Sequence, residues 1–424
     1  MQDNEKKPAL RFKGFTDPWE QRKLAELTKT ITTGKSVNSD EGEVSDGDIG
    51  VLKTSCVSYD RFNSSESKPV VKSEQQLVKC AVEKDSVIVS RMNTPERVGA
   101  CGYVSTDFPN LFLPDRLWKL KFQDTVDTYF VYMMLVSSAY KEKITSMASG
   151  TSGSMYNIPK ETFLNLQLVI PAKIDEQKQL GKILKKIDTL ITLHQRKYEK
   201  LVNIKKSMLD KMFPKNGASV PEIRFKGFTD LWEQRKLTNL CEKFTDGDWI
   251  EAKDQSDSGV RLVQTGNVGV TEYLDKPNNK KWISFETFEQ LHCEEVYPGD
   301  ILISRLPEPA GRACIMPNLG TKMITAVDCT IVRPNAVTST RFLLQYLSSQ
   351  AYFDAVNTCL AGGTRQRISR GNLAQFNVPI PSSKIEQEKI GEVLEKLDTL
   401  ITLHQRKLEK LQNIKKSCLE KMFV

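Results

Sequence analysis

Two long stretches of the chain carry apolar residues at alternating spacings of four and three. The first lies in residues 171–214 and the second in residues 381–424. Sustained alternation of this kind is typical of the seam of a coiled coil, whereas a helix lying on a globular core carries a broader apolar stripe. The positions predicted to pair are Leu184, Ile187, Ile191, His194, Tyr198 and Leu201 in the first helix, and Leu394, Leu397, Ile401, His404, Leu408 and Leu411 in the second.

The two helical stretches are near copies of each other, and both contain DTLITLHQRK. Some forty helical residues span about 60 Å, and one helix alone cannot bury its seam, so the simplest arrangement packs the two together. Antiparallel pairing puts one body at each end, generates a pseudo-twofold axis and brings His194 close to His404. We interpret these histidines as register-setting residues, since no third metal ligand has suitable spacing. Lys205 and Lys415 on the same seam are interpreted as register-setting residues or as residues that snorkel to solvent.

A second repeat precedes each helix by about 145 residues. RFKGFTD followed by WEQRKL occurs within Pro8–Leu24 and again within Pro221–Leu237, whereas the bodies between these opening motifs and the helices hardly resemble each other. A repeated framework with unrelated inserts suggests one scaffold that holds two different readers. The predicted organisation is a first body, a first helix, a second body and a second helix, over residues 1–170, 171–214, 215–380 and 381–424.

Strand-like runs dominate both bodies. Ala81–Arg91 and Glu295–Arg305 each read as a turn followed by an alternating, β-branched strand that ends in Ser-Arg. Each body then has a polar loop, a short strand, an amphipathic helical stretch, a Gly-rich loop and a closing strand that leads into the long helix. The sequence therefore predicts an α+β fold with two α/β bodies separated by two long antiparallel coiled-coil helices.

The opening motif carries the local signal of a helix start. Asp17 stands before Pro18 and three residues before Glu20, which is the pattern of an N-cap, an N1 proline and a capping glutamate. The second copy keeps Asp230 and Glu233 but has leucine in place of the proline. We expect the aromatic residues of this motif to anchor it to the body rather than to stack on bases; they are Phe12, Phe15 and Trp19.

The net charge of +8 is unevenly distributed. Residues 171–214 hold eleven basic against five acidic residues, and residues 381–424 hold nine against seven, so the two helices account for the whole excess. The bodies are close to neutral, which excludes a uniformly basic polyanion-binding protein but leaves room for local patches.

The composition also indicates in which cellular compartment the protein is expected. The amino terminus has no apolar segment of the kind found in signal peptides, and no uninterrupted apolar run of about 18 residues predicts a membrane helix. The nine cysteines are scattered without a CxxC pair. Reduced, mostly buried thiols in a cytoplasmic protein fit this pattern better than a disulfide framework or a zinc site.

Several polar loops carry residue types that read DNA. Base edges are recognised by Arg, Lys, Asn, Gln, Ser and Thr, while more numerous contacts to phosphate position the protein. Any of these residues could instead lie in a solvated loop without a role in binding, and Arg91 and Arg305 could form structural salt bridges. The closely spaced arginines near Arg367 are the stronger candidates for DNA contact. The candidates are Lys53, Arg91, Asn93, Arg97, Ser152, Ser154, Tyr156 and Asn157 in the first body, and Gln264, Asn267, Arg305, Arg312, Thr364, Arg365, Gln366, Arg367 and Arg370 in the second.

The sequence carries no supported catalytic motif. A phosphate-binding loop is discounted because Lys29 occupies the position of its first glycine. No Gly-rich methyl-donor loop occurs, and the spacing from Asp248 to Glu251 and Lys253 is too short for a nuclease-type metal site. We therefore expect no active site in this chain.

The repeated order and its motifs closely resemble the specificity (S) subunit of type I restriction–modification enzymes. The resemblance rests on the opening motifs, the paired strands ending in Ser-Arg, the Gly-rich loops and the helix starts of the form Pro-x4-Glu-Gln-x3-Gly, and it covers the whole chain. Those helix starts are Pro171, Glu176, Gln177 and Gly181 in the first copy, and Pro381, Glu386, Gln387 and Gly391 in the second.

The resemblance implies that each body is a target recognition domain that reads one half of a bipartite site on double-stranded DNA. The helices would fix the gap between the halves and dock two methyltransferase (M) subunits. S-adenosylmethionine, ATP and magnesium would then belong to the M subunits and to motor–nuclease (R) subunits, and this chain would itself catalyse nothing.

Two other classes remain open at this stage. A coiled-coil scaffold could use its two bodies to bind proteins, in which case no bipartite DNA sequence would be protected in a footprint. An enzyme with cryptic nuclease or methyltransferase motifs would instead modify or cut DNA as the purified chain alone.

Overall fold

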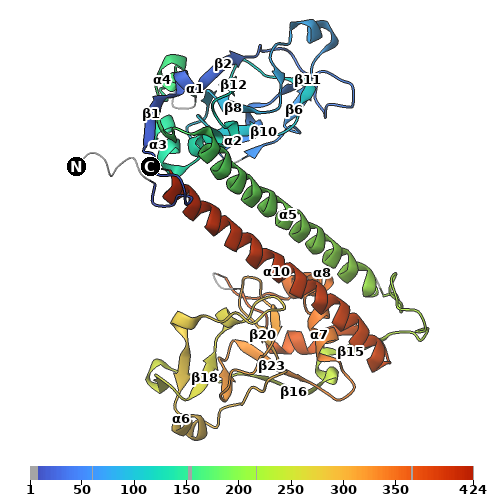
Figure 1. Ribbon diagram of the computed structural model, residues 1–424. Coiled ribbons are helices and arrows are strands. Elements are labelled where there is room, and N and C mark those ends of the chain that lie inside the picture. The colour runs from blue at the N-terminus through green and yellow to red at the C-terminus, as the bar shows by residue number, and fades with distance from the viewer. Residues whose placement is uncertain (1–7, 60, 151–154, 216, 364–365, 424) are drawn as a thin grey trace. The chain divides into compact units, whose positions relative to one another are not determined.

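The computed structural model describes residues 8–59, 61–150, 155–215, 217–363 and 366–423. The chain separates into unit 1, which comprises Met1–His194 and Lys407–Val424, and unit 2, which comprises Gln195–Arg406. Each unit therefore contains one body, the beginning of the long helix that follows that body, and the end of the other long helix. Figure 1 labels the elements along the chain.

The two long helices are α5 (Ile174–Met212) and α10 (Lys384–Met422), each of 39 residues. Within unit 1, the start of α5 at Leu180 and Leu184 shares a core with Met422 at the end of α10. Within unit 2, the end of α5 at Met212 shares a core with Leu394 near the start of α10. The paired segments of each unit therefore run antiparallel, as the sequence predicted.

Burial along these helices follows the predicted seam. The twelve residues predicted to pair are all buried or half-buried, whereas several apolar residues beside the seam are exposed. The proximity of His194 to His404 stays a prediction. The exposed neighbours of the seam are Ile183, Leu193, Val202 and Ile204 on α5, and Leu400, Leu403 and Ile414 on α10.

The body of unit 1 contains two four-stranded sheets, in the orders β10-β8-β12-β2 and β6-β3-β11-β7. Helix α2 packs against β8 and β10 of the first sheet. The elements are β1 (Trp19–Lys23), α1 (Leu24–Leu27), β2 (Thr28–Thr33), β3 (Gly50–Leu52), β4 (Val57–Ser58), β5 (Arg61–Phe62), β6 (Ser67–Pro69), β7 (Ala81–Val82), β8 (Ser86–Ser90), β9 (Met92–Asn93), β10 (Cys101–Val104), β11 (Phe108–Phe112), β12 (Leu117–Phe122), α2 (Thr128–Leu135), α3 (Ser138–Ser146), β13 (Tyr156–Asn157), α4 (Lys160–Leu164) and β14 (Gln167–Pro171).

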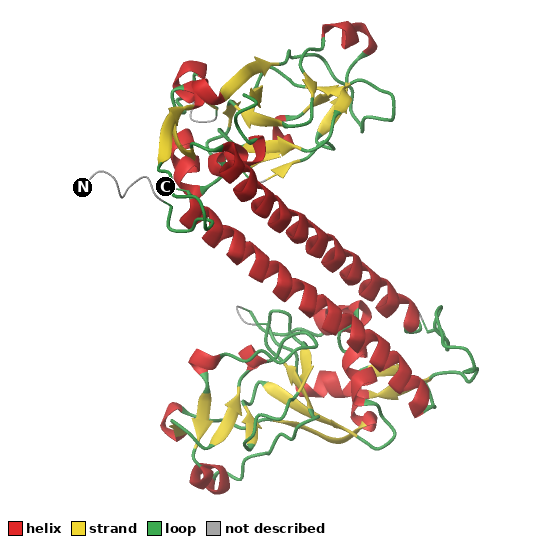
Figure 2. Ribbon diagram, in the orientation of Figure 1, coloured by secondary structure: helices red, strands yellow, loops and turns green. Residues whose placement is uncertain are grey.

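The body of unit 2 also contains two four-stranded sheets, in the orders β16-β23-β20-β21 and β17-β19-β18-β22. Figure 2 shows how strands and helices are distributed in it. The elements are β15 (Glu233–Lys236), β16 (Cys241–Asp246), β17 (Gln255–Ser256), β18 (Val260–Val263), β19 (Lys281–Ile283), α6 (Phe285–Gln290), β20 (Ile301–Ser304), β21 (Ala313–Ile315), β22 (Met323–Thr325), β23 (Cys329–Pro334), α7 (Thr340–Tyr346), α8 (Gln350–Thr358), α9 (Arg370–Gln375) and β24 (Asn377–Ile380).

The two bodies share a framework despite their different sequences. The sheet β10-β8-β12-β2 of unit 1 corresponds to β21-β20-β23-β16 of unit 2, and antiparallel pairing joins the matching neighbours. The strands that end in Ser-Arg, β8 and β20, are fully buried and central in these sheets. The predicted α+β fold with repeated architecture is thus confirmed.

The opening motif is a strand, so the predicted helix start is wrong. Trp19–Lys23 forms β1, which pairs antiparallel with the closing strand β14, and Glu233–Lys236 pairs with β24 in the same way. The backbone donors and acceptors of the motif are satisfied across this two-stranded sheet, which outweighs the local capping signal. Asp17 instead forms an exposed ion pair with Lys173, which lowers the pKa of the carboxyl group.

Two of the three aromatic residues of the opening motif, Trp19 and Phe12, pack against the body as expected. Trp19 is buried in the unit 1 core, and Phe12 packs against the same core. The amphipathic stretch near the end of each body differs in detail from its prediction, because it forms two helices rather than one. Ser137 and Ser349 are the N-cap residues of the second helix in each pair.

Each long helix begins with a buried ion pair to the opening motif. Arg11 donates to both carboxylate oxygens of Glu176, at 2.6 and 2.8 Å, and Arg224 does the same to Glu386, at 2.7 and 2.9 Å. Glu176 also accepts a hydrogen bond from the indole of Trp19. This bidentate contact raises the pKa of each arginine and fixes the helix to its body.

The Gln and Gly of each helix start hold the helix against the next element of the body. The side-chain oxygen of Gln177 accepts from the backbone N–H of Asp127, 3.0 Å away, and Gln387 accepts from Ser339 N–H at 2.8 Å. A Cβ atom on Gly181 would lie 2.5 Å from a carboxylate oxygen of Asp127, the N-cap residue of α2, so a larger residue would displace that side chain. The helix-start motif therefore holds α5 against α2 in unit 1 and α10 against α7 in unit 2.

All nine cysteines are free thiols, and five of them are buried. Burial raises the pKa of the Cys101 and Cys314 thiols to about 12. Among the described helices, none combines the length and apolar character needed to cross a membrane.

Candidate nucleic-acid interface

In both units, a loop leaves the central Ser-Arg strand and returns to it at a glycine. Gly99 N–H donates to Ser90 O and Gly311 N–H donates to Ser304 O, each at 2.7 Å. Both glycines have a positive φ, 81° and 84°, which other residues rarely adopt. In both units, the loop therefore places the residues that follow the central strand at the end of that strand.

The Gly-rich loop of each body closes on itself and docks beside that strand. Backbone hydrogen bonds join Ser149 to Asn157 in unit 1 and Ala361 to Arg367 in unit 2. The residue after each closure then donates its N–H to the strand-end arginine, Ile158 to Arg91 O and Ile368 to Arg305 O. The structure therefore brings together the two loops that the sequence proposed separately.

In unit 2 these loops form an arginine–aspartate cluster of Asp246, Arg305, Asp328, Arg367 and Arg370. Asp246 lies 3.6 Å from Arg305 and 3.8 Å from Arg370, and Asp328 lies 3.9 Å from Arg305 and 3.7 Å from Arg367. Arg305 is buried, whereas the side chains of Arg367 and Arg370 are 60% and 47% exposed. The cluster carries one net positive charge, and its exposed part consists of the two outer guanidinium groups.

Arg312 has a different environment from the outer arginines. It is buried and donates to four backbone carbonyls, those of Thr265, Val268, Leu306 and Pro309, at 2.6–3.0 Å. Burial lowers its pKa. Arg312 thus joins the loop after β20 to the turn after β18.

The turn after β18 contains the candidates Gln264 and Asn267. Asn267 is 3% exposed, its oxygen accepts from Gln264 N–H, and its side-chain nitrogen donates to Leu274 O. Gln264 is half-buried in a reciprocal capping box with Asn267. In this conformation both residues, like Arg305 and Arg312, hold the loops in place.

The candidates of unit 1 fall into three groups. Arg91 donates to Asp115 O at 2.8 Å, and the buried Asn93 donates to Ser90 Oγ at 3.0 Å. Tyr156 and Asn157 form β13 and pair with β9, so they lie beside Asn93. Arg97 is exposed in the same loop, whereas Lys53 follows β3 in the second sheet.

Four candidates, Ser152, Ser154, Thr364 and Arg365, lie outside the described residues. Gln366 is exposed beside Arg367. Asp246 and Asp328, which were not predicted from the sequence, orient three of the proposed arginines. Both aspartates stand at ends of neighbouring strands, β16 and β23, and the Asp-Gly pair at 246–247 was the only local signal of a strand end.

The nuclease-like residues do not come together. Asp248 accepts from Glu294 N–H and is half-buried, which raises its pKa, whereas Glu251 pairs with Lys253 at the surface. Within the described part of the chain, no three His, Cys, Asp or Glu residues are placed to hold a metal ion.

The family model of the type I restriction modification DNA specificity domain matches this chain twice, over residues 16–203 and 229–413. Together these matches cover most of the chain. The chain belongs to this family. It is a type I restriction–modification specificity subunit with two specificity domains in tandem, each of which includes one body and much of the long helix that follows it.

Curated relatives of this specificity subunit include two proteins of Methanocaldococcus jannaschii. The type I restriction enzyme MjaVIII specificity subunit is 23% identical over 305 residues, which cover 68% of each chain. The putative type I restriction enzyme MjaX specificity subunit is 22% identical over 418 residues, which cover 94% of this chain and 91% of that protein.

A solved structure has the same fold. The S subunit of a type I restriction–modification system from M. genitalium is 16% identical, with a TM-score of 0.66 over 98% of this chain and 99% of that one. At this level of identity the likeness concerns the fold, and the residues that read DNA have to be argued from this chain alone.

Proposed function

We propose that each specificity domain of this subunit reads one half of a bipartite site on double-stranded DNA, and that the paired helices set the gap between the halves. The observation that carries this proposal is the contrast between framework and loops. Opening strand, central sheet, helix start and long helix are repeated, whereas the loops that follow the central Ser-Arg strands share their first residue, Arg91 or Arg305, and differ in most of the other polar residues that could contact a base. Two copies of one scaffold with different reading loops suit an asymmetric target.

The environment of each candidate assigns it one of two roles. Arg367, Arg370 and Gln366 in unit 2, and Arg97 in unit 1, are exposed and can reach a groove. The buried candidates contact backbone carbonyls and neighbouring side chains, so they shape the loops that carry the exposed residues. Both roles affect recognition, because a base contact requires a side chain held in a fixed position.

The subunit would act with partners. The exposed apolar residues beside the seam of α5 and α10 provide a surface for two M subunits, since such residues would otherwise remain in water. S-adenosylmethionine, ATP and magnesium would belong to those M subunits and to the R subunits, and this chain would catalyse nothing. Its role would be to direct their chemistry to one sequence.

Replacement of one reading body tests the proposal. Exchange of residues 25–170 for the corresponding segment of a relative should change one half of the methylated sequence and leave the other half and the gap unchanged. Methylation-aware sequencing of DNA modified by the assembled complex reports all three at single-base resolution. If both halves changed together, the domains would not be independent readers, and if no bipartite sequence were modified or protected, a protein-binding scaffold would be the better account.

A further inference from the structure

One aspartate in each unit joins three elements. Asp188 of α5 accepts a hydrogen bond from Tyr129 of α2, 2.6 Å away, and pairs with Lys415 of α10 at 2.8 Å. In unit 2, Asp398 of α10 accepts from Gln345 of α7 at 2.8 Å and pairs with Lys205 of α5. Each carboxylate therefore contacts the reading body, lies on the helix that follows that body, and binds the opposite helix.

These ion pairs are largely shielded from solvent. The side chains of Lys415 and Lys205 are 15% and 12% exposed, and those of Asp188 and Asp398 are 23% and 24% exposed. A charge at such a position is costly unless it keeps its partner. Parallel pairing of the helices would instead place like charges opposite each other, so the two pairs favour the antiparallel direction.

The same two pairs also fix the register. In both units the residue numbers of the paired Asp and Lys add to 603. Ile191 and Gln412, which line one groove of unit 1, obey the same relation. A slip of one heptad would place Leu408 or Met422 opposite Asp188 and leave partly buried charges without partners. Slippage is therefore opposed more strongly than the apolar seam alone would oppose it.

The contact from the reading body is not explained by duplication. Asp188 and Asp398 belong to the repeated helix, as do Lys205 and Lys415, so their recurrence follows from the repeat. Tyr129 and Gln345 do not occupy equivalent positions. Alignment of the helix starts at Asp127 and Ser339 places Tyr129 opposite Arg341 and Met133 opposite Gln345. Two bodies with different sequences thus reach the equivalent carboxylates, Asp188 and Asp398, from different turns of their helices.

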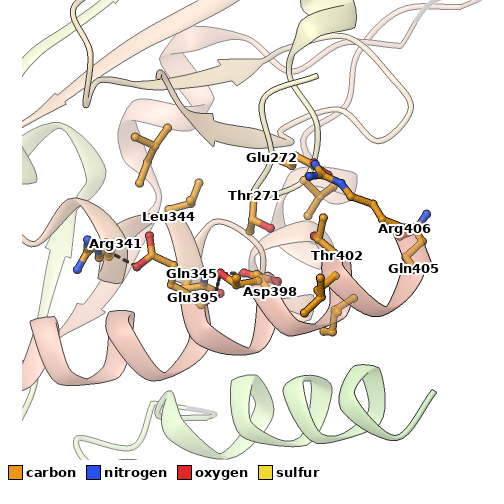
Figure 3. A pocket seen from close by; sticks show the side chains of 15 residues that line it. Thr271, Glu272, Arg341, Leu344, Gln345, Glu395, Asp398, Thr402, Gln405 and Arg406 are labelled. Atoms are coloured by element: carbon orange, nitrogen blue, oxygen red, sulfur yellow. Dashed lines mark hydrogen bonds and ion pairs between the residues drawn. The ribbon is translucent and has the colours of Figure 1, made fainter. Parts of the chain in front are cut away.

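Further side-chain pairs in unit 2 hold the body along α10. Figure 3 shows Asp398 and Gln345 in a groove of about 650 Å³ between α7, α10 and the Val270–Glu272 loop. Arg341 pairs with Glu395 at 3.0 Å, one turn before Asp398, and Arg406 pairs with Glu272 at 3.4 Å, two turns after it. Of the three contacts, the one at Asp398 also includes the opposite helix.

We propose that Asp188 and Asp398 are positioning residues that transmit the register of the helix pair to the orientation of each reading domain. This inference rests on the proposed function. A carboxylate shared by the body and the opposite helix prevents either from rotating alone. The expected consequence of its loss is a less strictly defined gap between the half-sites, with no change in the bases that each half-site contains.

A charge-reversal cycle on the full-length chain, assembled with its M subunits, tests this proposal. Asp188→Lys and Lys415→Asp should each broaden the range of modified gap lengths or abolish modification. The double reversal should narrow that range again without restoring a single gap length, because it re-forms the ion pair but not the carboxylate that Tyr129 contacts. The neighbouring exposed residue provides the matched control, since Lys416→Asp should leave the gap unchanged. Methylation-aware sequencing reads gap and half-sites together.

A second pair of variants separates positioning from stability. Tyr129→Phe keeps the ring and removes only the hydrogen bond to Asp188, so it should broaden the gap. Tyr140→Phe removes the hydroxyl that accepts a hydrogen bond from Val169 N–H elsewhere in the core, and it should lower the Tm without changing the gap. A single gap length in both Tyr129→Phe and Asp188→Lys would overturn the proposal, as would altered half-site bases.

A stability measurement that involves no DNA tests the ion pairs separately from the proposed function. In thermal unfolding of the full-length chain, each single reversal should lower the Tm by at least about 2 °C, and the double reversal should recover most of that loss. Additive losses in the double variant would contradict the ion pair as a register determinant. If the Tm values are non-additive but the wild-type complex modifies no bipartite sequence, the proposed function fails while the helix-pairing role stands.

Discussion

Arg312 and Arg367 show why residue type alone does not define the reading surface. Both were predicted from loops that follow strands, and both are arginines in polar segments. Arg312 makes four hydrogen bonds to backbone carbonyls, whereas Arg367 is largely exposed and pairs weakly with Asp328. The sequence placed both arginines in loops beside the central strand but could not separate these roles, because the partners of each guanidinium come from distant segments.

Alanine substitutions at these two positions should therefore affect different properties, namely stability for Arg312 and DNA binding for Arg367. Arg312→Ala leaves four buried carbonyls without their donor and should destabilise unit 2 by roughly 2–4 kcal/mol, as measured by denaturant unfolding. Arg367→Ala should leave stability within about 0.5 kcal/mol of wild type and weaken DNA binding by about 1–3 kcal/mol. Relaxed preference at one base would indicate a base contact, and a uniform loss across sequences would indicate a phosphate contact. Equal loss of stability in both variants would contradict this assignment.

Among the elements, the long helices were predictable and the opening strands were not. A heptad pattern is local, since each turn of α5 and α10 repeats the same choice of apolar and polar positions. β1 pairs with β14, which lies about 150 residues later, and no local pattern in WEQRK reports that pairing. The Asp17–Glu20 signal favoured a helix there, and long-range backbone pairing reversed it. In each body, the stretch before the Gly-rich loop was predicted as one helix but forms two, and the second helix has Ser137 or Ser349 as its N-cap.

The seam and its exposed neighbours should respond differently to truncation. Leu394 of α10 is fully buried in the unit 2 core, so Leu394→Ala should cost about 2–5 kcal/mol of stability. Leu403 on the same helix is 44% exposed, and Leu403→Ala should change the unfolding free energy by less than about 1 kcal/mol. Chemical denaturation of the full-length chain measures both. Similar losses at the two positions would mean that the seam has been misassigned.

For the whole molecule, the order of the parts could be predicted from the repeat, and the structure added the residues that join them. The repeat predicted two bodies and two helices, and the resemblance of its motifs to specificity subunits agrees with the family match over both halves. The junctions Arg11–Glu176, Arg224–Glu386, Asp188–Lys415 and Asp398–Lys205 were not predicted as pairs. Each joins segments far apart in the chain, and a sequence pattern cannot say which charges meet. Together, these four ion pairs attach each body to the paired helix segments of its unit.

A matched lengthening of both helices tests the central claim most directly. Seven residues that continue the heptad pattern would be inserted after Lys197 in α5 and after Lys407 in α10, between the Asp and Lys of each helix. The double insertion keeps both ion pairs in register and adds about 10 Å, the rise of roughly three base pairs. An insertion in one helix alone separates one pair and should impair assembly or modification.

Methylation-aware sequencing of DNA modified by the doubly lengthened subunit, assembled with its M subunits, is the decisive measurement. Two readers held by a rigid helix pair predict unchanged half-site sequences separated by a longer gap, by up to roughly three base pairs. An unchanged gap, or altered bases within either half-site, would contradict the account.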